Sequence, residues 1–182
     1  MRIEYLHASK FGNGAMVAAH FKEKMAAQGL DVDVHHIREV RPDELPPADL
    51  YVFSSPGRFG KPIRAMRRFL NKVSLPAGTR YGILTTEAMP KPDKTTGQMP
   101  SEEELVANHQ RVRPIMNEIL EGHGLVKIAE DKIYVTGLRG PLEDGWETKV
   151  DAFACALCAS LGRGAAAPVR PPQEATSTRV PV

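Results

Sequence analysis

A short glycine-rich segment near the amino terminus has the residue types that bind an anion. It reads Ser9-Lys10-Phe11-Gly12-Asn13-Gly14, follows an apolar run and leads directly into a helical pattern. Backbone N–H groups and the positive end of the helix dipole would converge on a bound anion, and glycines let the backbone approach it closely. The Ser9 hydroxyl and the Asn13 amide add two donors. The segment predicts a phosphate-monoester site, with a plain strand-to-helix turn as the alternative.

Other phosphate-binding motifs fit this segment poorly. A dinucleotide motif would begin with Gly12 and Gly14, but its third glycine position holds Val17, and the next strand ends in a basic stretch that includes Arg38 instead of an acidic residue. The segment also lacks the Gly-Lys-Ser/Thr of a P-loop. A receiver domain is excluded because no acidic residues follow the first and third predicted strands.

Alternating strand and helix patterns must position these residues. Apolar runs predict five strands at residues 3–8, 32–37, 50–53, 81–85 and 132–135, with a short companion at 125–128. One helical pattern follows the first strand as far as Gly29, and others occupy residues 63–73, 101–119 and 144–161. The helix at 101–119 begins with a capping box of Ser101 and Glu104, and Pro114 should kink or break it. The pattern predicts an α/β fold with a doubly wound five-stranded parallel sheet of order 2-1-3-4-5. Ligands of such sheets bind at the carboxyl ends of strands one and three.

A second segment follows the third strand and reads Ser54-Ser55-Pro56-Gly57-Arg58-Phe59-Gly60-Lys61-Pro62. With Ser-x-Phe-Gly-Asn after strand one and Pro-x-Arg-Phe-Gly after strand three, the chain resembles the flavodoxin-like FMN-binding family. It is nearest to flavodoxins and to the WrbA-type NAD(P)H:quinone oxidoreductases. The similarity runs from the first strand to Thr86, and the alternating elements extend it to about Leu161.

The resemblance implies FMN as the cofactor, with residues 9–14 around its phosphate. It assigns contacts with the isoalloxazine ring to Pro56, Gly57, Arg58, Phe59 and Gly60, and to a third loop after strand four that contains Thr85, Thr86 and Glu87. Phe59 would offer the ring a flat apolar surface, and the peptide groups of Gly57 and Gly60 could turn toward it. For Glu87 a polar strand end without a ligand is an equal alternative.

The segments depart from the family pattern at two points. Phe11 and Gly14 stand where flavodoxins usually have hydroxyl residues, so phosphate contacts should depend more on the backbone and be weaker. Arg58 and Lys61 replace the carboxylates that surround the flavin in acidic electron carriers. A cation 4 Å from an anionic reduced flavin stabilises it by about 4 kcal/mol at an effective dielectric near 20. We therefore expect a less negative potential for full reduction than in a low-potential flavodoxin.

Three further features carry weaker predictions. Cys155 and Cys158 have redox-motif spacing, but they fall late in a helix, where the dipole disfavours thiolates, so we expect packing roles. The six histidines form no ligand cluster, and no metal site or catalytic residue is predicted. Residues 89–100 form a loop long enough to be a lid, in which Lys91 and Lys94 could meet the phosphates of a nicotinamide nucleotide.

Length and composition predict a single domain at residues 1–162, followed by a flexible Pro/Ala-rich tail at residues 163–182. The tail accounts for the formal net charge of +2, so the domain has none, and neither nucleic acid nor membrane is expected as a partner. Only two cysteines occur, and no signal peptide is visible, so a reducing cytoplasmic location is expected.

These observations predict an FMN-binding, flavodoxin-like electron-transfer protein that works with a redox partner protein. One alternative is an NAD(P)H-dependent quinone oxidoreductase, whose partners would be a small quinone and NAD(P)H. A second alternative is a flavodoxin-fold interaction module without flavin, which Phe11 and Gly14 would allow. Homo-oligomerisation is compatible with each.

Overall fold

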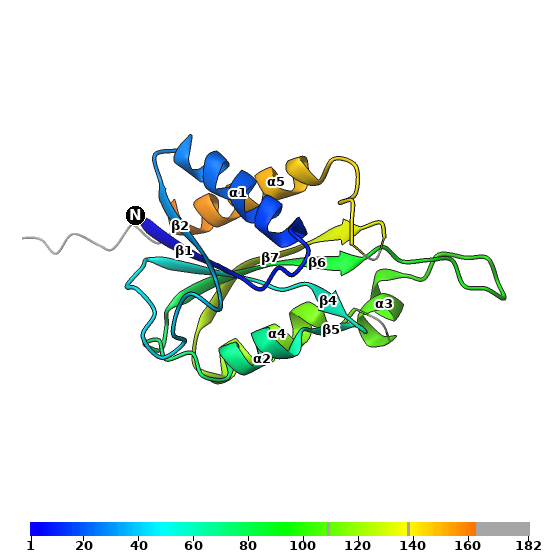
Figure 1. The fold of residues 1–182 in the computed structure, drawn as a ribbon, viewed down its shortest axis with the longest axis horizontal. Coiled ribbons are helices and arrows are strands. Elements are labelled where there is room, and N and C mark those ends of the chain that lie inside the picture. The colour runs from blue at the N-terminus through cyan, green and yellow to red at the C-terminus, as the bar shows by residue number, and fades with distance from the viewer. Residues whose placement is uncertain (109, 138, 163–182) are drawn as a thin grey trace, which may run out of the picture.

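A five-stranded parallel sheet lies between two layers of helices in the computed structural model, which describes residues 1–108, 110–137 and 139–162 (Figure 1). The strands pair in the order β2-β1-β3-β6-β7. The sheet strands are β1 (Arg2–His7), β2 (Asp31–His36), β3 (Leu50–Ser54), β6 (Arg80–Ala88) and β7 (Val126–Val135). Because β6 and β7 are the fourth and fifth strands of this sheet along the chain, the predicted order 2-1-3-4-5 is confirmed.

Helices cover both faces of the sheet. They are α1 (Asn13–Ala26), α2 (Arg64–Leu70), α3 (Glu102–Asn108), α4 (Val112–Gly122) and α5 (Trp146–Gly162). Helices α1 and α5 lie on one face, where Phe21 and Phe153 pack in one apolar cluster with Tyr5 of β1. Helices α2 and α4 lie on the other, where Met66 and Met116 belong to a second cluster. The apolar stripe of α1, formed by Val17, Phe21 and Met25, is fully buried against the sheet.

The segment after β3 was expected to be an open loop, but it folds into a small hairpin. Strands β4 (Gly57–Arg58) and β5 (Lys61–Pro62) pair antiparallel, and Arg58 faces Lys61 in the register. Only Phe59 and Gly60 connect them, both with positive φ, of 51° and 70°. A two-residue connection with two positive φ values is the turn that matches the twist of a hairpin.

The predicted helix over residues 101–119 is two helices, α3 and α4. The Ser101/Glu104 capping box at its start is confirmed, because Ser101 N–H donates to Glu104 Oε2 (2.8 Å) and Glu104 N–H donates to Ser101 Oγ (3.2 Å). The interruption lies before Pro114, which is the third residue of α4. A proline costs no hydrogen bond there, because the first N–H groups of a helix have no intrahelical acceptor.

Two strands are longer than predicted. Residues 126–135 form the single strand β7 instead of a companion and a separate fifth strand, with a register shift opposite Tyr81 and Gly82 of β6. Strand β6 continues through Glu87 to Ala88, because each of its last residues pairs with β7. The predicted third loop, Thr85 to Glu87, is therefore part of the sheet.

Helix α1 ends at a glycine turn. Gly29, with φ of 75°, closes α1 as predicted. Its N–H donates to Ala26 O, and Leu30 N–H donates to Met25 O.

No helix in the described ranges is long and apolar enough to cross a membrane. The predicted tail, residues 163–182, lies outside the described residues.

Candidate functional site

The predicted phosphate segment and the hairpin begin at neighbouring strand ends. His7 pairs with Ser54 at the ends of β1 and β3, and Ala8 N–H donates to Ser54 O over 3.1 Å. Next to them Pro56 forms a bridge with Thr86 of β6. The three predicted segments therefore meet along one edge of the sheet, at the point where the strand order reverses.

The start of α1 presents unpaired backbone donors. Gly12 precedes the helix with φ of 93°, a conformation that residues with a Cβ rarely adopt, and the space where its Cβ would lie is open. Gly12 O accepts the N–H of Met16 (2.9 Å). Within the described residues the N–H groups of Asn13 and Ala15 have no acceptor. Two N–H donors at a helix start, beside an open glycine, can hold an anion.

Ser9 and Asn13 each make a hydrogen bond within the protein that leaves a side-chain hydrogen available for an anion. Ser9 Oγ accepts the N–H of Gly14 (3.1 Å), so it caps α1 from outside the helix. Asn13 Nδ2 donates to the carbonyl of Arg139 (3.2 Å) and ties α1 to the loop after β7. Donation from these two side chains to an anion therefore stays a prediction, beside the backbone groups of the cradle.

Cations and two histidines surround this helix start. Lys10 and Arg139 both lie over the ring of Phe11, each 5.4 Å from its centroid, so the half-exposed Phe11 gathers positive charge beside the cradle. His7 Nδ1 accepts the N–H of Ser9 (3.3 Å), and its ring meets that of His36 edge to face. Burial, with the charge of His36, lowers the pKa of His7, which keeps Nδ1 an acceptor.

Phe59 lies at the tip of the hairpin with an exposed side chain and a left-handed backbone conformation. Its side chain is 90% exposed, and its φ of 51° belongs to the left-handed region, which costs a residue with a side chain about 1–2 kcal/mol. Arg58 lies over its ring at 5.5 Å from the centroid. An aromatic side chain that is both strained and exposed contributes nothing to the core, and such residues gather at binding sites.

A cavity of about 360 Å³ lies between the hairpin, the end of β6 and the α3–α4 junction. It is lined by Gly57, Phe59 and Gly60, by residues 87–90, by Lys91, Asp93 and Pro100 of the following loop, and by Leu105, Gln110 and Val112. Its size is in the range of small-molecule sites. Gly57 is required at its floor, because a Cβ there would lie 3.0 Å from Val112 Cγ2.

Glu87 reaches this cavity from the sheet and not from a loop. The side chain is only 2% exposed, Thr85 Oγ1 donates to its Oε1 (2.7 Å), and its Oε2 has no hydrogen-bond partner in the described structure. Burial raises the pKa of Glu87 above 4.5, although the Thr85 hydrogen bond and the charges of Arg113 and Lys132 oppose this shift. Glu87 therefore takes up a proton more readily than an exposed glutamate does.

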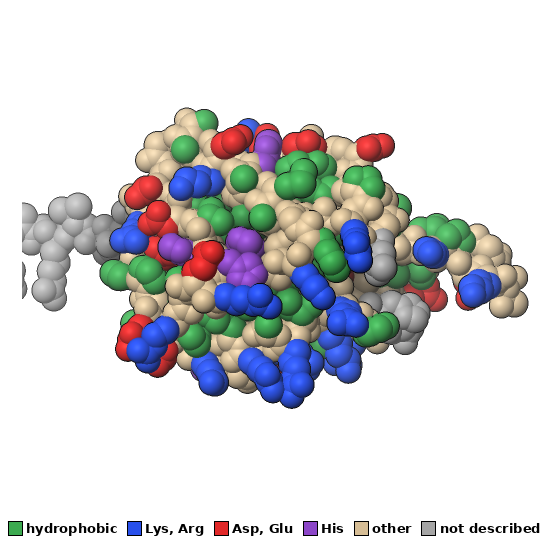
Figure 2. All heavy atoms as spheres, viewed as in Figure 1, with side chains coloured by type: hydrophobic (Ala, Val, Ile, Leu, Met, Phe, Trp, Pro, Cys, Tyr) green, Lys and Arg blue, Asp and Glu red, His purple; other side chains and the backbone are tan. Residues whose placement is uncertain are grey.

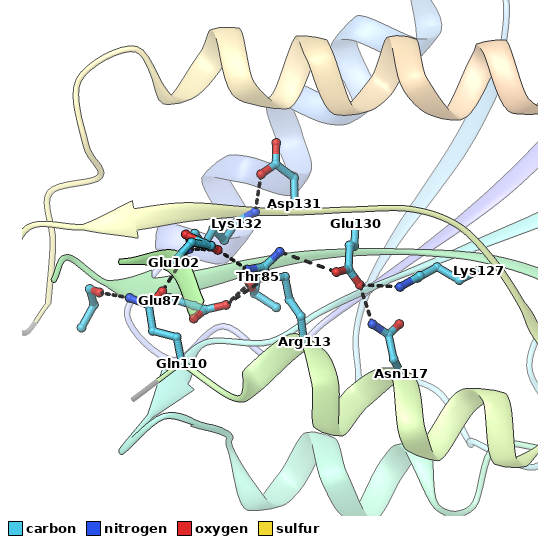
Figure 3. Close-up of polar contacts among 11 residues, drawn as sticks. Thr85, Glu87, Glu102, Gln110, Arg113, Asn117, Lys127, Glu130, Asp131 and Lys132 are labelled. Atoms are coloured by element: carbon cyan, nitrogen blue, oxygen red, sulfur yellow. Dashed lines mark hydrogen bonds and ion pairs between the residues drawn. The ribbon is translucent and has the colours of Figure 1, made fainter. Parts of the chain in front are cut away.

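A network of charged residues supports this end of the cavity (Figure 3). Arg113 of α4 approaches three carboxylates, those of Glu87 (3.6 Å), Glu102 (3.2 Å) and Glu130 (3.6 Å). Lys132 of β7 donates to both oxygens of Glu102, at 2.7 and 2.8 Å, and thereby fastens α3 to the sheet. The network holds the wall of the cavity in place.

Gln110 links Lys132 to the end of β6. Lys132 Nζ donates to Gln110 Oε1 (3.1 Å), and Gln110 Nε2 donates to the carbonyl of Ala88 (3.1 Å). Sequence reasoning missed Gln110, Arg113 and Val112 as site residues, because the predicted helix ran through them and its break was expected at Pro114. Only the capping box at Ser101 marked a helix start in this region.

The cysteines lie outside this site, whereas part of the predicted lid borders it. Cys158 is partly buried, with its Sγ 3.0 Å from Gln28 Oε1, as a packing role predicts, but Cys155 is exposed, so for that residue the packing interpretation is wrong. No group of three or more His, Cys, Asp or Glu side chains in the described ranges is placed to hold a metal ion. Of the predicted lid, residues 89–91, Asp93 and Pro100 line the cavity.

Comparisons with known proteins place the fold. No protein-family model and no curated protein sequence matches the chain. Among solved structures it is similar to a flavodoxin from the domain Archaea, with a TM-score of 0.65 and 14% identity over 89% of this chain and 99% of that one. A Streptococcus pneumoniae TIGR4 flavodoxin gives 0.60 and 20% over 87% and 99%.

A larger protein contains the same unit. Rubredoxin oxygen:oxidoreductase from Desulfovibrio gigas gives a TM-score of 0.65 and 14% identity over 91% of this chain but only 37% of that protein. At such identities the likeness concerns the fold, which agrees with the strand order and with the helices on both faces. The chain therefore has a flavodoxin-like α/β fold.

Proposed function

We propose that this protein binds FMN along the carboxyl edge of its sheet and transfers electrons through it. The observation that carries the proposal is the placement of Phe59, strained and exposed beside a cavity, at the same sheet edge as the open helix start around Gly12. One element suits a flat ring, and the other suits a phosphate. The likeness to flavodoxin structures supports the same conclusion.

The residues present fit such a ligand. The unpaired N–H groups of Asn13 and Ala15 would hold the phosphate, with Lys10 and Arg139 supplying positive charge. Phe59 would cover the ring and exclude water from one side of it. When bound, FMN would supply one- and two-electron transfer.

A titration of the flavin-free protein tests the proposal. FMN and riboflavin are added separately, and binding is followed by flavin fluorescence and visible absorption. We expect FMN to bind at least tenfold more tightly than riboflavin, because only FMN has the phosphate. Equal binding would remove the phosphate site, and no binding of either would favour the flavin-free interaction module.

Quinone reduction with NAD(P)H is the second candidate function, and the WrbA resemblance stays a prediction. The observation in its favour is the cavity wall that contains Lys91, which offers a cation to a second ligand beside Phe59. Steady oxidation of NADPH or NADH by a quinone would select this enzyme. Replacing Lys91 and Lys94 by Ala should then raise the KM for the nucleotide, and unchanged kinetics would exclude their part in binding it.

A further inference from the structure

One stretch of the chain is entirely free of acidic residues. Between Asp49 and Glu87 there is no Asp or Glu, whereas seven Lys and Arg residues occur there. The stretch includes the hairpin and α2, so it begins at the candidate site and continues over the neighbouring helix. Such a one-sided distribution produces a positive potential over one face of the molecule.

The structure gathers five of these residues on the surface. Arg58 and Lys61 face each other across the hairpin, Arg64 and Arg68 lie one helical turn apart on α2, and Lys72 follows α2. All five are exposed, and together we call them the basic face. Figure 2 shows blue side chains in a row along the lower edge of the view, where Figure 1 places α2.

The charge of the basic face is not neutralised locally. None of its five residues forms a salt bridge with a carboxylate in the described chain. Asp43 is already paired with Arg41 at 2.9 Å, which lowers the pKa of Asp43, and the charge of Lys72 lowers it further. Elsewhere Arg2, Arg41 and Lys127 are exposed and do form ion pairs with carboxylates. The basic face therefore retains its field for a partner outside the chain.

We propose that the basic face is the docking surface for an acidic redox protein. The inference rests on the proposed function, because the hairpin that begins the face also carries Phe59. A negatively charged partner drawn to Arg64 and Arg68 would cover the hairpin and approach the edge where the flavin ring is expected. Attraction between opposite charges would orient the two proteins before they touch.

An acidic protein fits better than a nucleic acid or a membrane surface. Residues 1–162 have no net charge, so the basic face is a local excess of positive charge that acidic residues elsewhere on the molecule balance. The face borders the exposed ring of Phe59. Arginines next to an exposed aromatic are typical of the energetic centre of a protein interface.

Binding to proteins of opposite charge tests the proposal. The probes are an acidic plant-type ferredoxin, a basic c-type cytochrome, a single-stranded oligonucleotide and phosphatidylserine vesicles, titrated at about 0.05 M and about 0.2 M salt. We expect the ferredoxin alone to bind measurably at the lower salt, and more weakly at the higher. The variant Arg64→Gln/Arg68→Gln should weaken that binding by about fivefold. The control Lys22→Gln/Arg38→Gln removes two exposed cations outside the basic face and should change it by less than twofold.

Three results would overturn the proposal: no ferredoxin binding, equal losses in the two variants, or tighter binding of the oligonucleotide or the vesicles with the same dependence on Arg64 and Arg68. The measurement needs no flavin, so it is separate from the FMN titration. A protein that binds FMN but not the ferredoxin would leave the proposed function standing. A protein that binds the ferredoxin but not FMN would show a docking surface without a redox role.

Discussion

Phe59 and Gly60 share one turn, and both have positive φ, yet only the glycine adopts that conformation without cost. The position of Phe59 is one that Asn fills readily in two-residue hairpins. The cavity beside it explains why an aromatic residue is kept there at the expense of stability.

Replacing Phe59 should separate stability from binding. We expect Phe59→Asn to raise the free energy of unfolding by about 1 kcal/mol through relief of the left-handed strain. Loss of the aromatic surface should weaken FMN binding by about fivefold. Chemical denaturation and fluorescence titration measure the two effects. Phe11→Asn is the control for the stability measurement alone, because Phe11 is also exposed but does not have positive φ. A variant that is less stable than the wild type would contradict the strain argument.

The Ser9 hydroxyl should matter both to α1 and to the ligand phosphate. Ser9→Ala removes the acceptor of Gly14 N–H and should cost about 1 kcal/mol of stability. It should weaken FMN binding by about tenfold, through loss of a hydroxyl beside the phosphate, and leave riboflavin binding unchanged.

The matched control is Ser101→Ala. Ser101 Oγ also accepts a backbone N–H at a helix start, that of Glu104 in α3. This variant should lose similar stability without any change in FMN affinity. If both variants lost FMN affinity equally, the effect would come from stability and not from a phosphate contact.

The positions of the sheet and its site edge follow from sequence periodicity, whereas the walls of the site do not. The apolar run of β3 and the apolar stripe through Phe21 are local patterns, and such patterns predict the strand order. The glycine-rich segment at residues 9–14 is also local, and it predicts the anion site. The hairpin was missed because Phe59 is not a residue that favours a left-handed turn.

The end of β6 was missed for a different reason. Thr85, Thr86 and Glu87 are polar and resemble a strand end, but pairing with β7 keeps them in the sheet. Glu87 also approaches Arg113 of α4, which is distant in the sequence. Tertiary contacts of this kind leave no periodic signal in either segment.

Two glutamates of the network should respond to pH in opposite directions. Burial raises the pKa of Glu87 in the folded state above 4.5, so the folded protein holds this proton more tightly than the unfolded chain. Its contribution to stability is complete below pH 4.5 and is lost as the pH rises through the folded pKa. Glu87→Gln should therefore be more stable than the wild type at pH 7, and the difference should shrink at pH 4.

Glu102→Gln provides the opposite case. The hydrogen bond from Lys132 lowers the pKa of Glu102, so its contribution is present above pH 4.5 and is lost as the pH falls through the folded pKa. This variant should be less stable than the wild type at pH 7 and equal to it at low pH. Urea unfolding between pH 3 and pH 8 measures both variants. Parallel pH profiles for the two would refute the assignment.

Arg58 should set the potential of a bound flavin, since the reduced ring carries more negative charge than the oxidised one. The guanidinium lies 5.5 Å from the centroid of Phe59, the residue expected to cover the ring, and it is exposed, so water screens part of its charge. Arg58→Gln should lower the potential for full reduction by about 20 mV, the two-electron equivalent of about 1 kcal/mol. The shift should shrink as salt is added. Redox titration of the FMN-loaded protein measures it, with Lys22→Gln as the control for a cation on α1. A strongly negative potential that Arg58→Gln leaves unchanged would mean that the cations of the hairpin do not reach the flavin, and that Phe59 faces something else.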